Sequence, residues 1–122
     1  MKAILGIVAG VVAWFAVVIG ASLLLRAAAP ALSAALAVHA TPVALGGRLA
    51  ISFAGSLAGG ALAAWIGGRR AALIAGVLLL AYWATYHIAV IWHQFPIWYH
   101  LTFFVSLPLL SWLGGRTTGR RT

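Results

Sequence analysis

The chain has 122 residues, of which 65% are hydrophobic and 7% are charged, and its mean hydropathy is +1.11. Because about a quarter of the residues of a soluble domain are charged, this composition argues against a soluble fold and predicts an integral membrane protein. The net charge of +8 arises without a single Asp or Glu, which excludes paired-carboxylate catalysis and disfavours the usual proton relays and cation sites of membrane carriers.

The chain also contains no cysteine, so disulfides, thiolate nucleophiles, iron–sulfur ligation and Cys-based zinc sites are excluded. The basic residues lie at the ends of apolar runs and do not form one patch. We therefore expect anionic lipid headgroups as partners of these charges and expect no nucleic acid.

The first apolar run, residues 3–25, predicts a transmembrane helix, because 23 residues at about 1.5 Å each cross a hydrocarbon layer of roughly 30 Å. A secretory signal is the competing interpretation, but its apolar core would be too long. Residues 30–40 are less apolar and lie between two prolines. A short interfacial helix and a loop both fit this segment.

A second transmembrane helix is predicted over residues 43–66. Its small residues recur every four positions, which lets helix backbones approach closely in lipid. We therefore expect this helix at the centre of the bundle. The residues expected to make this packing are Ser52, Gly55, Ser56, Gly59 and Gly60.

The remaining apolar runs predict a third helix over residues 71–92 and a fourth over residues 96–113. Pro96 suits the start of a helix, so Phe95 and Pro96 are expected at a hairpin tip. Residues 114–122 are expected to form a frayed basic tail. The predicted fold is one all-α domain, residues 1–113, built as a bundle of four transmembrane helices.

The basic residues also predict an orientation. Six basic residues are predicted at one side of the membrane, namely Lys2, Arg69, Arg70, Arg116, Arg120 and Arg121. Arg26 and Arg48 are predicted at the other side. The positive-inside rule then places both termini in the cytoplasm and the hairpin between the third and fourth helices outside, as in a multi-pass protein of a bacterial inner membrane.

The second half of the chain contains the runs GRRAALIAGVLLL and FPIWYHLTFF, followed by LGGR. These runs resemble a group of small uncharacterised bacterial four-helix inner-membrane proteins, and the string from Phe95 to His100 is the most specific part. The resemblance implies an integral membrane protein from a bacterium and carries no activity with it.

The stretch from Tyr82 to His100 holds three of the four histidines and half of the aromatic residues. His87 and His100 are predicted at similar depth on adjacent antiparallel helices, where they could supply both axial ligands of a haem b or line a quinone site. The competing interpretation is an aromatic belt at the membrane surface with hydrogen bonds between helices. Both interpretations stay open at this stage.

Other candidate sites are weaker. His93 is predicted away from the face of His87, so we expect no three-histidine metal site. Arg48 could contact an anionic substrate or a lipid phosphate, or could extend along its own stem to the outer surface. No acid is available to orient a histidine beside a serine, so no catalytic residue is predicted.

The function expected from the sequence is that of a non-catalytic accessory or scaffold subunit, which docks on other membrane protein subunits of a larger complex. The alternative is a redox protein that binds haem or quinone through His87 and His100.

Overall fold

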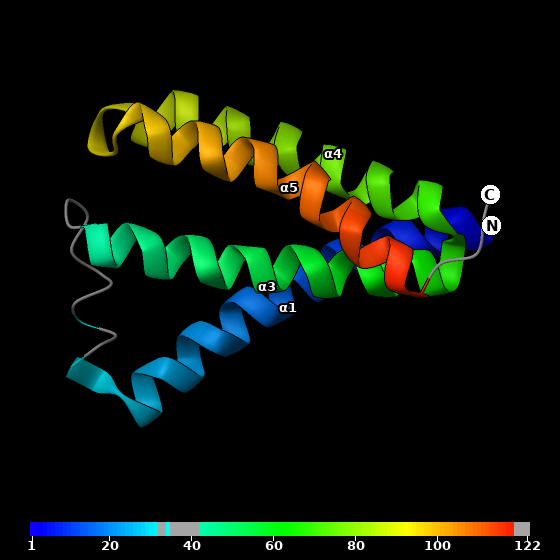
Figure 1. The fold of residues 1–122 in the computed structure, drawn as a ribbon, viewed down its shortest axis with the longest axis horizontal. Helices are drawn as coiled ribbons and strands as arrows, with labels where there is room; N and C mark the ends of the chain where they lie inside the picture. The colour runs from blue at the N-terminus through cyan, green and yellow to red at the C-terminus, as the bar shows by residue number, and fades with distance from the viewer. Residues whose placement is uncertain (32–33, 35–41, 119–122) are drawn as a thin grey trace.

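The computed structural model describes residues 1–31, 34 and 42–118, and these residues are helical apart from short connections (Figure 1). A π-helix and a 3-10 turn follow directly on α4. The elements are α1 (Lys2–Ala28), α3 (Pro42–Gly67), α4 (Arg69–Tyr86), the π-helix η1 (His87–Ile91), the 3-10 helix η2 (Trp92–Gln94) and α5 (Ile97–Thr118).

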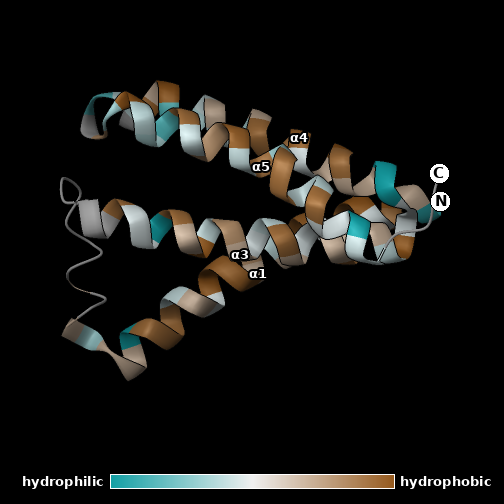
Figure 2. Ribbon diagram, in the orientation of Figure 1, coloured by the Kyte–Doolittle hydropathy of each residue, from teal (hydrophilic) through white to brown (hydrophobic). Residues whose placement is uncertain are grey.

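Four helical segments of the described chain are long and apolar enough to cross a membrane, as predicted. Their bounds are Lys2–Ala28, Leu45–Gly67, Arg69–Val90 and Ile97–Thr118. Hydrophobic residues occur along the whole length of these helices, and the hydrophilic ones concentrate toward the helix ends (Figure 2). The interfacial helix expected over residues 30–40 lies largely outside the described residues.

Helix α3 is the most buried of the four spans and packs against α1, α4 and α5. The start of α1 and the end of α5 lie at one end of the bundle, where all four helices come together (Figure 1). Toward the opposite end, α1 and the α4–α5 pair diverge from α3 (Figure 1). Side chains still join them there, because Leu45 and Leu49 of α3 belong to the same buried cluster as Phe95 and Tyr99 of the hairpin.

Small residues set the close approach of α3 to its neighbours. A Cβ atom built on Gly59 would lie 2.7 Å from the carbonyl oxygen of Gly10 on α1. A Cβ atom on Gly60 would overlap the carbonyl oxygen of Ser111 on α5. These two glycines thus lie where a helix backbone contacts α3 directly, and Ser52, Gly55 and Ser56 are buried beside them.

A buried hydrogen bond joins α1 to α3 within this packing. The indole Nε1 of Trp14 donates to Ser56 Oγ over 3.1 Å, and Ser56 is fully buried. Replacing Ser56 with alanine would leave a buried indole N–H without an acceptor, so we expect a loss of about 1–3 kcal/mol in the free energy of unfolding. Denaturant titration in mixed micelles measures this loss.

The matched control is Ser22→Ala. Ser22 is exposed, and its hydroxyl donates to the carbonyl of Val18 in its own helix. That substitution should change the free energy of unfolding little. Equal stability of the Ser56→Ala and Ser22→Ala variants would contradict a structural role for the Trp14 hydrogen bond.

The end of the last helix differs from the sequence prediction. The helix expected to end at residue 113 continues to Thr118, because Gly114 and Gly115 pack against α3 and α4. A Cβ on Gly115 would lie 2.6 Å from the Cβ of Ala72, and one on Gly114 would overlap the carbonyl of Leu57. The glycines that suggested a frayed tail are thus packed helix residues.

Candidate functional site

Two buried histidines lie against each other where α4 passes into the hairpin. His87 begins the π-helix η1, and His100 lies in the first turns of α5. Their Nδ1 atoms are 2.7 Å apart, a hydrogen-bond distance, and the exposed fractions of the residues are 3% and 0%. The structure therefore brings together the two residues that the sequence singled out.

The hydrogen bonds assign the tautomers of the neutral pair. The Nε2 atom of His100 lies 3.0 Å from the carbonyl oxygen of Trp92, which can only accept, so His100 carries its proton on Nε2. The Nδ1 atom of His100 must then accept from Nδ1–H of His87. This leaves the Nε2 atom of His87 as the unprotonated nitrogen of the pair.

Aromatic rings surround both imidazoles. Phe103 stacks on His87 with ring centroids 4.8 Å apart, and Trp92 stacks on His100 at 4.4 Å. Trp83 and Phe104 present their edges to His87 at 6.3 Å and 5.3 Å. These rings fix the orientation of the pair, and each hydrogen bond is made inside an apolar shell where it is electrostatically strong.

The distance between the two Nδ1 atoms can be compared with the distance that a metal ion or a haem iron between them would require. A metal ion between two imidazoles would hold the ligand nitrogens about 4 Å apart, twice a metal–nitrogen bond of about 2 Å. The 2.7 Å contact is a direct hydrogen bond, so joint ligation by His87 and His100 would need the rings to separate. His93 is exposed, and the described residues contain no group of three or more metal-ligating side chains.

Arg48 of α3 lies within the same end of the bundle and contacts the hairpin. Its guanidinium carbon is 5.5 Å from the centroid of the Phe95 ring, and its charge lies close enough to the Tyr99 hydroxyl to interact with it electrostatically. Tyr99 in turn lies parallel to His87, with centroids 6.1 Å apart. Sequence reasoning named Arg48 but missed Tyr99 and Phe95 as its partners.

A polar stripe continues inward from Arg48 along α3. Ser52 follows one helical turn later and Ser56 follows one turn after that, so the three side chains lie on neighbouring positions of one face. Ser56 is bonded to Trp14. Ser52 is 4% exposed, and its Oγ has no hydrogen-bond partner within the described part of the chain.

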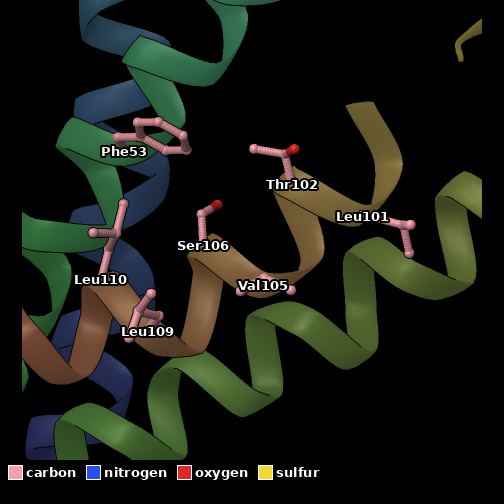
Figure 3. A pocket seen from close by; sticks show the side chains of 7 residues that line it. All are labelled: Phe53, Leu101, Thr102, Val105, Ser106, Leu109 and Leu110. Atoms are coloured by element: carbon pink, nitrogen blue, oxygen red, sulfur yellow. The ribbon is translucent and has the colours of Figure 1, made fainter. Parts of the chain in front are cut away.

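A separate groove lies between α3 and α5 and encloses about 480 Å³ (Figure 3). Its lining is mostly apolar and comes from Phe53 of α3 and from Leu101, Thr102, Val105, Ser106, Leu109 and Leu110 of α5. The hydroxyl of Ser106 donates to the carbonyl of Phe103 in its own helix. The groove therefore offers shape and apolar surface more than hydrogen bonds.

No protein-family model, curated protein or solved structure matches this chain. Function is therefore inferred from the chain's own residues.

Proposed function

We propose that this protein is a four-span integral membrane protein with both termini in the cytoplasm, and that it is a non-catalytic accessory subunit of a larger membrane complex. Insertion in the bilayer is supported by four helical segments of sufficient length and hydropathy. The basic residues support the orientation, because Lys2, Arg69, Arg70 and Arg116 belong to the end of the bundle where α1 and α4 begin and α5 ends. A bacterial inner membrane is the expected location.

The docking role is inferred from an exposed face of small residues on α3, the central helix. Gly46, Ala50, Ala54 and Ala58 follow each other at four-residue spacing on α3, and all four are exposed. No atom lies within 4 Å of a Cβ built on Gly46. These residues are called the alanine face below.

Much of the other exposed surface differs from the alanine face in side-chain size. The exposed positions of α1 and α5 include large aliphatic residues such as Ile4, Val8, Leu101 and Val105. Large side chains fill space against lipid tails, whereas small ones let another helix approach closely. The alanine face is thus the surface best suited to a helix of another subunit.

Site-specific photo-cross-linking in native membranes tests this role. A photoreactive residue at Ala54 should give one discrete product with another membrane protein, and Ala58→Leu should abolish it by keeping the partner helix away. The matched control is a photoreactive residue at Ala81, an exposed alanine on α4, which should give no discrete product. A product of twice the chain mass, or none from Ala54, would contradict the proposal.

The alternative function, a redox protein that binds haem, can be tested by the absorption spectrum of the purified protein. Haem held by His87 and His100 would give a Soret absorption band that both His87→Ala and His100→Ala remove. Because the two nitrogens bond directly to each other, we expect the purified protein to have no such band. A Soret band lost in both variants, with unchanged expression, would favour the redox function over the accessory role.

A further inference from the structure

We propose that the groove between α3 and α5 is a binding site for one acyl chain of a phospholipid from the outer leaflet. Its lining comes from Phe53 of α3 and from six residues of α5 between Leu101 and Leu110. The inference rests on the insertion and orientation proposed above. It does not depend on the accessory role, because no residue of the alanine face lines the groove.

The groove results from a change of side-chain size along one face of α3. Gly60 and Phe53 are seven residues apart, so they lie on the same helix face about two turns from each other. At Gly60 the backbone of α5 contacts α3 directly. Nearer the outer end, the Phe53 ring lies across from Thr102 and Ser106 of α5, with the groove between them (Figure 3). The groove therefore belongs to the way the two helices pack.

The chemistry of the lining favours a hydrocarbon ligand. None of the lining residues is charged, and apart from Thr102 and Ser106 they are Phe, Leu or Val. The Ser106 hydroxyl donates to the carbonyl of Phe103 and so needs no partner from a ligand. A polar ligand buried there would lose hydrogen bonds to water without gaining others. The ligand is therefore apolar where it lies in the groove.

The length of the groove matches an acyl chain in one leaflet. Leu101 lies four residues after the start of the span Ile97–Thr118, and Leu110 lies nine residues further. At about 1.5 Å per residue, the groove runs about 13–14 Å along the helix axis. One leaflet contributes roughly 15 Å, half of a hydrocarbon layer of about 30 Å. One acyl chain thus extends along the groove toward the bilayer centre.

Side-chain size distinguishes an acyl chain from a partner helix. Leu101, Val105 and Leu109 are large side chains of the lining and are exposed. Such side chains hold the backbone of a second helix away, whereas small residues let it approach. A flexible hydrocarbon chain follows this surface and contacts both helices. Without it, the lining would lose those dispersion contacts.

Photo-cross-linking in reconstituted vesicles tests the site. The purified protein is placed in dioleoyl phosphatidylcholine vesicles, with phosphatidylcholine that contains a diazirine in one acyl chain as a minor component. After irradiation, peptide mass spectrometry locates the adducts. We expect a several-fold higher yield on the groove residues than on Val8 and Val12, which are exposed large residues of α1 outside the groove.

Thr102→Phe places a ring in the groove from an exposed position. It should lower the adduct yield there about tenfold or more, because a bulky group in an apolar pocket excludes the ligand. The matched control is Thr85→Phe at an exposed threonine of α4 outside the groove, which should leave the yield unchanged. If Thr102→Phe does not fold, as judged by circular dichroism and gel filtration, Val105→Phe takes its place.

Two results would overturn the site while leaving bilayer insertion intact. One is an equal adduct yield in the groove and on Val8 and Val12, which describes an ordinary lipid-facing surface. The other is an unchanged yield in the groove of the folded Thr102→Phe or Val105→Phe variant. Absence of adducts from α1 as well as from the groove would contradict both the site and the proposed insertion.

A photoreactive residue at position 102 in native membranes tests the other occupants. The product should have the added mass of one phospholipid. A discrete product with another membrane protein would assign the groove to a partner helix, and a product of twice the chain mass would assign it to a second copy. Either result would overturn the proposal, as would an adduct of another lipid class or no adduct. Absence of a product from Ala54 would contradict the accessory role alone.

Discussion

Gly60→Leu is expected to disrupt packing of α3 on α5 and to lower the free energy of unfolding by about 3 kcal/mol or more. A Cβ at this position overlaps the backbone of Ser111, which cannot rotate away as a side chain can. Overpacking a well-packed core costs about 1–3 kcal/mol and more where the backbone must shift. Denaturant titration in mixed micelles, with gel filtration to monitor assembly, measures the effect.

Gly20→Leu is the matched control. Gly20 is an exposed position of α1, and no atom lies within 4 Å of a Cβ built there. Leucine has a higher helix propensity than glycine, so this variant should be as stable as the wild type or slightly more stable. If the Gly60 and Gly20 variants were equally stable, the close contact of α3 with α5 would be wrong.

His100→Ala is expected to lower the free energy of unfolding by about 3–5 kcal/mol. The substitution removes both hydrogen bonds of the buried imidazole and leaves the Nδ1–H of His87 and the Trp92 carbonyl without partners. It also empties the space beside the Trp92 ring, and such voids add to the cost. The same titration measures it, with His93→Ala as an exposed histidine control that should cost little.

A double-mutant cycle isolates the contact between the two histidines. His87→Leu and His100→Leu should each be destabilising, but the double variant should cost less than the sum, with a coupling of roughly 1–3 kcal/mol. The reason is that replacing both partners with apolar groups leaves no orphaned donor on either ring. Strict additivity would show that the pair does not interact.

Much of the fold could be predicted from the length of the apolar runs. A run of about 20 apolar residues that crosses a bilayer must form a helix to satisfy its backbone, and this rule located the four long helices. The π-helix His87–Ile91 was not predicted, because its residues have the same local preferences as an α-helix. The predicted end of the last helix, residue 113, was too early because Gly114 and Gly115 were interpreted as the start of a tail. Their packing against α3 and α4 depends on the tertiary fold.

The candidate site was predictable only in part. Similar depth on two antiparallel helices indicated that His87 and His100 could face each other, and the structure places their Nδ1 atoms 2.7 Å apart. Depth does not give the rotation of each helix about its axis, so the direct Nδ1 contact was missed. The proximity of Arg48 to Phe95 and Tyr99 likewise depends on how α3 lies beside the hairpin, and one sequence alone does not contain that relation.

Topology is the claim on which the proposed function depends most directly, and cysteine labelling tests it. Because the chain has no native cysteine, single variants at two exposed positions, His93→Cys in the hairpin and Thr117→Cys near the end of α5, give a signal without background. In intact cells, a membrane-impermeant maleimide should label H93C, whereas T117C should react only after permeabilisation. Labelling of T117C from outside, or of both variants from the same side, would contradict the four-span arrangement with cytoplasmic termini.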